Sequence, residues 1–225
     1  LERLWQKGVE QEKTVLFPNW IDTDLIKPLV QPSEFREEWG IGDDKIVVLY
    51  SGNMGRKQGL EILLVSARLL VDVPEVLFLL CGDGAMRAKL QKDAHDLPNI
   101  HFYPLQPLEQ LNNLLNLADI HILPQRADAA DLVMPSKLSG MLASGKVVVA
   151  TASPESELGS IVSDVGILAP PGDAAQLSGA LLTLARNPEQ RVDLGEKGRN
   201  WVVSHWEMHK VLRTFEAHLK NMLES

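Results

Sequence analysis

The chain has 225 residues, of which 45% are hydrophobic and 23% are charged, and its formal net charge is −8. This composition is typical of a globular protein, and the length allows one large α/β domain or two small ones. The negative charge gives the chain as a whole no electrostatic attraction for nucleic acid, so any phosphate site must be local. A single cysteine, Cys81, excludes an internal disulfide framework. No apolar run reaches the roughly 20 residues that span a bilayer.

Six short apolar runs predict buried strands, because they lack the polar alternation of a half-exposed sheet. They lie at 45–51, 76–81, 100–103, 120–123, 147–150 and 165–168. Helical patterns lie at about 60–71, 85–95, 107–117, 135–144, 173–186, 188–204 and 206–223. Asp173 is the expected N-cap of one helix, and Pro188 the expected first residue of the next. Strands alternating with helices predict an α/β, Rossmann-like three-layer domain with a mainly parallel sheet.

The chain divides into three parts by composition and pattern. Residues 1–35 contain Pro18, Pro28 and Pro32 and no strong periodicity, which is typical of an interdomain connection and domain entry. Residues 36–204 carry the Rossmann-like pattern, and residues 205–225 form a terminal helix. The first residues, LERLWQKGVEQ, include no initiating methionine and no secretory signal, so we expect the chain to be a fragment.

A glycine-rich segment, SGNMGRKQG at 51–59, follows the first predicted strand and precedes a helix. Gly52 and Gly55 would let the backbone approach a ligand closely. Arg56 can hold phosphate oxygens with its planar fork, and Lys57 adds a point charge. The alternative is an ordinary turn with solvated basic residues, and the spacing does not decide between the two. The glycine spacing is neither the dinucleotide fingerprint nor a Walker A pattern, which argues against ATP hydrolysis.

The segment 131–150, DLVMPSKLSGMLASGKVVVA, predicts a loop, a helix that begins at Pro135, and a buried strand. A helix N-terminus presents free backbone N–H groups and a partial positive charge, which suits an anion. Lys137 in the first turn opposes the helix macrodipole. An anion bound between the helix end and Lys137 would remove that conflict. Lys137, Ser136 and Asp131 are therefore the candidate binding residues of this segment.

The remaining candidates have structural interpretations that we favour. Asp83 in the GDG sequence at 82–84 is typical of a turn residue that binds local backbone. The six histidines show no metal-binding spacing, and His205 and His209 lie in a helix with tryptophan and methionine neighbours. Cys81 ends an apolar run, so we expect it in the core.

Taken in order, these motifs resemble the C-terminal domain of family 4 glycosyltransferases. The similar segments are PNWID at 18–22, the glycine-rich strand end, GDG at 82–84, LADIHILP at 117–124, MPSKL at 134–138 and GILAPPGD at 166–173. The resemblance covers nearly the whole chain. It extends to bacterial members that build cell-surface polysaccharides such as O-antigen. Members of this family have two Rossmann-like domains that face a cleft, the GT-B fold.

The resemblance implies that the chain is the donor-binding half of a retaining glycosyltransferase. A missing N-terminal domain of the same polypeptide would bind a lipid-linked or saccharide acceptor, and the helix at 205–225 would pack back toward that domain. The donor would be a nucleoside diphosphate sugar, with UDP as the expected carrier. The resemblance implies no metal, no other cofactor and no nucleic acid partner. It implies a cytoplasmic enzyme, with peripheral association at the inner face of the membrane.

The resemblance also assigns roles to residues. Arg56, Lys57 and Lys137 would be the catalytic residues, because they would stabilise the leaving diphosphate. By analogy with oxyanion donors, removing Arg56 or Lys137 should cost about 2–4 kcal/mol of transition-state stabilisation. The donor-binding residues would be Gly52, Asn53, Gly55, Asp83, Tyr103, Leu105, Asp131, Met134, Pro135, Ser136 and Leu138.

One part of the family pattern is absent. The family commonly carries two glutamates eight residues apart, and these would fall at Leu132 and Gly140. Asp131 is the candidate replacement for the first acid, and the second, which holds the ribose hydroxyls in relatives, has no obvious replacement. Two alternatives therefore stay open: a Rossmann-like module that binds a nucleotide or phosphorylated ligand without chemistry, and a nucleotide-sugar epimerase with the same architecture.

Overall fold

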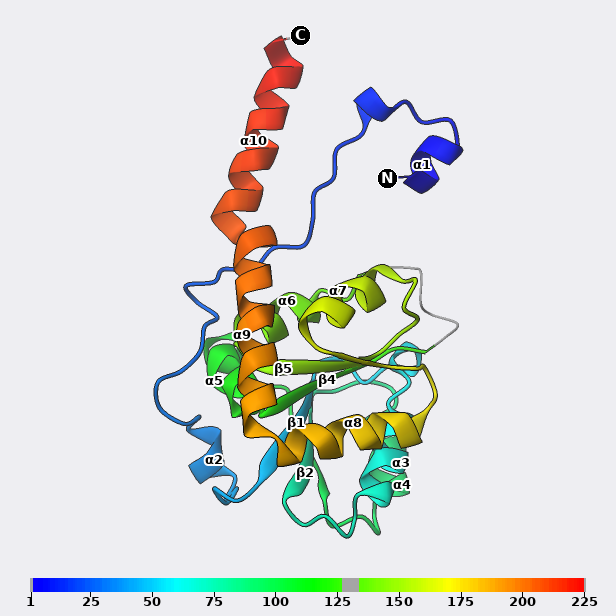
Figure 1. Ribbon diagram of the computed structural model, residues 1–225, viewed down its shortest axis with the longest axis vertical. Coiled ribbons are helices and arrows are strands. Elements are labelled where there is room, and N and C mark those ends of the chain that lie inside the picture. Colours follow the sequence, from blue (N-terminus) through cyan, green and yellow to red (C-terminus); the bar gives the residue numbers. More distant parts are fainter. Residues whose placement is uncertain (1, 127–133, 225) are drawn as a thin grey trace.

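The protein, described here by a computed structural model over residues 2–126 and 134–224, is built on one six-stranded sheet (Figure 1). The strand order is β3-β2-β1-β4-β5-β6. The strands are β1 Ile46–Ser51, β2 Val76–Cys81, β3 Ile100–Tyr103, β4 Ile120–Pro124, β5 Val147–Thr151 and β6 Ile167–Ala169. Every neighbouring pair of these six strands is parallel. The predicted parallel α/β sheet is confirmed.

Helices cover both faces of the sheet, which makes the three predicted layers (Figure 1). On one face, α3 Glu61–Leu69, α4 Arg87–Asp93 and α8 Ala174–Arg186 pack over a core that includes Tyr50 and Phe78. On the other face lie α2 Phe35–Glu38, α5 Leu111–Leu117, α6 Lys137–Ala143, α7 Glu157–Val165 and α9 Pro188–His205. The four inner strands β2, β1, β4 and β5 are buried on both sides, as their continuous apolar runs predict, whereas the edge strands β3 and β6 are only partly buried.

Two elements differ from the sequence-based expectation. A helix, α7, occupies 157–165, where we predicted no helix and placed the start of a strand at Val165, so β6 begins at Ile167. Ser156 caps α7 by accepting a hydrogen bond from the Gly159 N–H (3.0 Å), which is a typical N-cap contact. The helix predicted at 107–117 begins as a 3₁₀ turn, η3 Leu108–Gln110, before α5.

The two ends of the chain extend together from this body (Figure 1). The amino-terminal part contains α1 Glu2–Gln6 and η1 Gln11–Lys13, and the carboxyl-terminal part is α10 Met208–Glu224. The rings of Phe17 and Phe215 lie 4.6 Å apart. The Ile21 N–H donates to the Trp206 carbonyl (2.9 Å), and the Ile21 carbonyl accepts from the N–H of Met208 (3.0 Å), the first residue of α10. Within 2–126 and 134–224, no helix is both long and apolar enough to cross a membrane.

Candidate functional site

The chain direction creates a topological switch point at the carboxyl ends of β1 and β4. The connection after β1 leads to α3 on one face of the sheet, whereas the connection after β4 leads to α6 on the other face. Because neighbouring strands feed opposite layers here, this switch point is where open α/β sheets bind ligands, in a crevice beyond the strand ends. Both basic segments that we singled out in the sequence, at 51–59 and at 134–138, follow these two strands.

The loop after β1 packs tightly against the loop after β2. The Gly52 N–H donates to the Cys81 carbonyl (2.9 Å), and the Met54 N–H donates to the Asp83 carbonyl (2.7 Å). Gly82 has a φ of +151°, and a Cβ there would lie 1.9 Å from the Gly52 carbonyl oxygen. The glycine at 82 is therefore required by this close approach. The two loops form one hydrogen-bonded surface at the sheet edge.

Lys137 reaches across the crevice from α6 to β1. Its Nζ donates a hydrogen bond to the Tyr50 hydroxyl (2.9 Å) and lies 4.2 Å from the centre of the Tyr50 ring. The Tyr50 hydroxyl in turn donates to the Asn53 carbonyl (2.5 Å). Gly52 provides the space for this arrangement, since a Cβ there would lie 3.2 Å from Nζ. Lys137 is thus fixed beside the backbone of the glycine-rich loop.

Burial lowers the pKa of the Lys137 ammonium to about 8. No carboxylate in the described ranges forms an ion pair with it, and its hydrogen-bond partner Tyr50 is a phenol whose pKa burial raises. The half-buried Lys137 ammonium loses part of its hydration and gains only a neutral partner, so a bound anion would stabilise it. The edge of the sheet is therefore prepared for an anion.

The other two predicted cations lie at the same edge in a different environment. Arg56 and Lys57 belong to a 3₁₀ turn, η2 Arg56–Gln58, and both side chains are exposed. Neither forms an ion pair or side-chain hydrogen bond with another described residue. They can move toward an anion, but they are not held in one position as Lys137 is.

The sequence of this chain matches a known protein family. A model described as "Glycosyl transferases group 1" matches residues 32–201. The chain belongs to this family. It is 39% identical over 160 residues to WcaI of Escherichia coli K12, which is named as a colanic acid biosynthesis glycosyl transferase; the match covers 69% of this chain and 39% of that protein.

Solved structures of glycosyltransferases have the same fold. Sucrose-phosphate synthase from Thermosynechococcus elongatus superposes with a TM-score of 0.80 at 21% identity, over 99% of this chain and 56% of that one. HepE of Anabaena, solved in complex with UDP-glucose, superposes with a TM-score of 0.79 at 18% identity, over 98% of this chain and 61% of that one. The fold is that of the GT-B transferases. The chain spans less than two thirds of the length of each of these three proteins.

The segment after β4 differs from its predicted form. The helix α6 has seven residues and begins at Lys137, two residues later than predicted, because Pro135 and Ser136 form the turn that precedes it. Assignments of helix ends commonly differ by this amount. With so short a helix, the case for an anion rests on Lys137 more than on a helix dipole. Asp131 lies outside the described residues.

The other residues of the MPSKL segment are divided between surface and core. Ser136 is exposed, and Met134 and Pro135 are half-buried. Leu138 is completely buried in the core under α6, so its contact is with the protein interior. The prediction that Leu138 borders a donor stays a prediction, and the structure leaves it no exposed side chain with which to do so.

Three of the predicted donor-binding residues, Asp83, Tyr103 and Leu105, lie at or just after the carboxyl ends of β2 and β3. The Asp83 carboxylate accepts a hydrogen bond from the Gly84 N–H (2.7 Å), which is the local turn contact that we favoured. Tyr103 stacks on Trp39 with ring centres 3.7 Å apart and 9° between the planes. Leu105 is 67% exposed. An exposed Leu105 beside a half-buried aromatic ring leaves apolar surface at this end of the edge.

The second acidic position is structurally unsuited to an acid. Gly140 is buried in α6, and a Cβ there would lie 3.3 Å from Leu115 Cδ1. Leu132, the first acidic position, lies outside the described residues. Of the later glutamates, Glu155 accepts a hydrogen bond from the Ser153 hydroxyl, which lowers the pKa of its carboxyl. Ribose recognition therefore has no assigned acid in the described structure.

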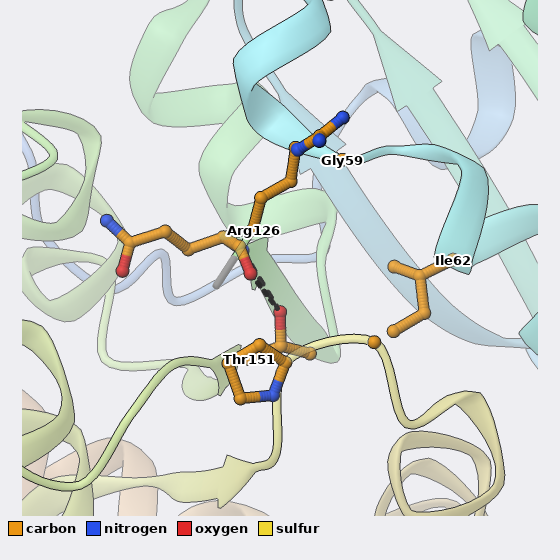
Figure 2. A pocket seen from close by; sticks show the side chains of 7 residues that line it. Gly59, Ile62, Arg126 and Thr151 are labelled. Carbon is orange, nitrogen blue, oxygen red and sulfur yellow. Dashed lines mark hydrogen bonds between the residues drawn. The ribbon is translucent and has the colours of Figure 1, made fainter. Parts of the chain in front are cut away.

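Sequence reasoning missed two residues at this edge, Tyr50 and Arg126. Arg126 follows β4, and its side chain lies over Gly59 beside a cavity of about 300 Å³ that Thr151 also lines (Figure 2). The available signal for Arg126 was a basic residue just after a strand. For Tyr50 it was a hydroxyl within an apolar strand, which normally indicates only core packing.

Cys81, the last residue of β2, is a buried polar residue that belongs to the core and not to the candidate site. The Cys81 Sγ donates to the Pro104 carbonyl (3.0 Å), and burial raises the pKa of this thiol to about 11. Such a thiol stays protonated and unreactive. The prediction that Cys81 belongs to the core is confirmed by its complete burial. No cluster of three or more histidine, cysteine or acidic residues suited to a metal occurs in the described part of the chain.

Proposed function

We propose that the chain is the donor-binding part of a retaining glycosyltransferase. In this proposal the carboxyl edge of β1 and β4 binds the diphosphate of a nucleoside diphosphate sugar. The observation that carries the proposal is the position of Lys137, which is half-buried at the carboxyl edge with a neutral tyrosine as its partner. Membership of the glycosyl transferases group 1 family favours this function over a non-catalytic module or an epimerase.

The chemistry follows from the charge that develops when the glycosidic bond breaks. The leaving diphosphate gains negative charge, and a cation already held in place stabilises it without further reorganisation. Lys137 would supply this fixed charge, and Arg56 and Lys57 would add mobile charge from the exposed turn. The proposal includes no metal and no cofactor besides the donor.

The donor and acceptor are proposed from the similar proteins. HepE was solved with UDP-glucose, which supports a UDP-linked donor. The name of WcaI includes colanic acid biosynthesis, which supports an acceptor in bacterial cell-surface polysaccharide synthesis. An enzyme of this kind would act in the cytoplasm, with peripheral contact to the inner face of the membrane when the acceptor is lipid-linked.

The extended ends of the chain are the proposed contact with an N-terminal acceptor domain. Leu16 and Phe17 in the entry segment are 63% and 45% exposed, and Leu219 and Met222 on α10 are 44% and 56% exposed. Apolar side chains grouped in this way commonly mark an interface. The prediction for residues 1–35 and 205–225 stays a proposal.

Isothermal titration calorimetry of the chain with UDP, GDP, ADP and TDP tests the binding proposal. We expect one or more of these nucleotides to bind, and we expect Lys137→Met to weaken the affinity at least tenfold. Lys146→Met is the matched control, because Lys146 is also partly buried and lies just beyond the other end of α6. Its affinity should equal that of the unmodified chain.

Two results would overturn the proposal. One is the absence of binding by all four nucleotides at millimolar concentration. The other is binding that Lys137→Met and Lys146→Met weaken equally, since this would place the anion away from the crevice or show a general loss of structure. Circular dichroism of each variant separates these causes.

A further inference from the structure

The strand residue Tyr50 has contacts that a simple core residue would not need. Its side chain is completely buried under α3, yet its hydroxyl lies at the carboxyl edge and makes two hydrogen bonds. It accepts from Lys137 Nζ (2.9 Å) and donates to the Asn53 carbonyl (2.5 Å). The hydroxyl therefore joins α6 to the glycine-rich loop through Lys137 and Asn53, which are 84 residues apart in the sequence.

We infer that Tyr50 is a positioning residue, which holds the Lys137 ammonium and the backbone at Asn53 in the arrangement that receives the donor diphosphate. This inference rests on the proposed function. Tyr50 itself does not touch the donor in this account. It acts through Lys137, whose long side chain would otherwise sample several rotamers and lose conformational entropy on binding.

The surroundings of Tyr50 leave little freedom for another arrangement. The loop that its hydroxyl holds is also fixed by the Met54 N–H, which donates to the Asp83 carbonyl (2.7 Å), and by the Met54 carbonyl, which accepts from Met86 (2.9 Å). A Cβ at Gly84 would lie 2.6 Å from the Asn53 side-chain oxygen. Because these contacts form one network, removing the hydroxyl should affect Lys137 and the loop together.

The hydroxyl also stabilises the charged form of Lys137, since an ammonium donates a stronger hydrogen bond than a neutral amine does. On the described segments that follow the strands around Nζ, the charged side chains are Arg56 and Lys57 after β1, Asp83 after β2 and Arg126 after β4. None of them pairs with Lys137. Removal of the hydroxyl should thus lower the pKa of Lys137 further below its present value.

Tyr50→Phe tests this inference, because phenylalanine keeps the ring and removes only the hydroxyl. We expect its affinity for UDP to fall five- to tenfold at pH 7, and the pH at which affinity declines to move to a lower value. Ser144→Ala is the matched control: its buried hydroxyl also makes two hydrogen bonds, to the Met141 carbonyl (2.7 Å) and with His121 Nε2 (3.1 Å), at the other end of α6. This control should lose stability and keep the UDP affinity and its pH profile.

A second measurement does not depend on nucleotide binding. The pKa of Lys137, followed by NMR of its ε-methylene group in the free chain, should be lower in Tyr50→Phe than in the unmodified chain and unchanged in Ser144→Ala. An unchanged pKa together with an unchanged UDP affinity would overturn the positioning role. Failure of the unmodified chain to bind any of the four nucleotides would instead overturn the proposed function, whatever the pKa.

Discussion

Lys137 is the first residue of α6, and Lys146 follows the end of this helix. The two lysines have different electrostatic environments. Burial lowers the pKa of both. Lys146, at the amino edge of the sheet, lies in the field of the Asp119 carboxylate, which opposes this lowering. Lys137, at the carboxyl edge, has a tyrosine hydroxyl and no carboxylate among the described residues. At the amino ends of the strands, the charge of Lys146 is thus partly compensated by Asp119. At the carboxyl ends, the charge of Lys137 has no such partner among the described residues, so a bound anion would compensate it.

The neighbouring arginines at the amino edge follow the same rule as Lys146. Arg36 forms an ion pair with Asp119 (2.7 Å). Arg199 donates to the carbonyls of Thr23 (2.8 Å), Ile26 (2.7 Å) and Ala143 (2.8 Å). These contacts join the entry segment, α6 and α9. The cations of the amino edge therefore stabilise the fold, whereas Arg56, Lys57 and Lys137 at the carboxyl edge form no ion pair with another described residue.

The largest expected effect is on turnover. Lys137→Met in the full-length enzyme should lower kcat/KM by an amount equivalent to about 2–4 kcal/mol, because a preorganised cation at the leaving group is lost. Steady-state kinetics with the cognate donor measure this value. Lys146→Met serves as the control, and an equal loss in both variants would remove the distinction between the two edges.

The next largest effect is expected at the amino edge, where a substitution should lower stability and leave ligand binding unchanged. Arg199→Met should lower the free energy of unfolding by about 3 kcal/mol, since three buried carbonyls lose a charged donor. Urea denaturation of the chain measures this change. The nucleotide affinity of the folded variant should be unaffected, and weakened binding would show that the amino edge also contributes to the ligand site.

The pH dependence of stability gives a similar or slightly smaller effect. The folded pKa of Lys137, about 8, lies below that of an unfolded lysine, about 10.4, so the unfolded chain binds more protons between these values. Stability should therefore rise with pH across this window, by roughly 2–3 kcal/mol from this residue. Lys137→Met should be more stable than the unmodified chain at pH 7 and should lose this rise, as urea denaturation from pH 7 to 10 would show. A rise of the same size in Lys137→Met would contradict the account.

The smallest effect is expected at the exposed turn. Arg56→Ala and Lys57→Ala should each weaken UDP affinity by about 0.5–1 kcal/mol, because exposed charges interact weakly through water and are screened by salt. The sequence alone assigns Arg56 and Lys137 equal costs, and the burial of Lys137 separates them. Calorimetry at two salt concentrations checks this: only the contribution of the exposed pair should fall markedly at high salt. A loss at Arg56 as large as that at Lys137 would contradict the separation.

Much of the fold could be predicted from the sequence. The strands at 46–51, 76–81 and 147–151 are continuous β-branched or leucine-rich runs, and such runs have few alternatives once helices alternate with them. The helix α7 was missed because its sequence, ELGSIVSDV, contains glycine and two serines, which have low helix propensity. The N-cap hydrogen bond of Ser156 and the burial of Leu158, Val162 and Val165 stabilise the helix despite this low propensity.

The candidate site was predicted only in part, for a physical reason. The loops that follow parallel strands share one edge, so Lys137 and the glycine-rich segment could be placed together from the order of elements. The contact between Lys137 and Tyr50 could not be predicted, because one sequence gives no information about which side chains meet across 87 positions. The difference in exposure between Lys137 and Arg56 could not be predicted for the same reason, since it depends on which side chains surround each cation.

The most direct test of the two-edge account is a backbone amide NMR titration of the chain with UDP. The account predicts chemical-shift changes and slowed exchange at Gly52, Asn53 and Lys137, with the amides near Lys146 and Arg199 unaffected. Lys137→Met should abolish the changes at Gly52 and Asn53 at the same UDP concentration. Shifts that cluster around Lys146 and Arg199, or that persist unchanged in Lys137→Met, would contradict the claim that the carboxyl edge receives the diphosphate.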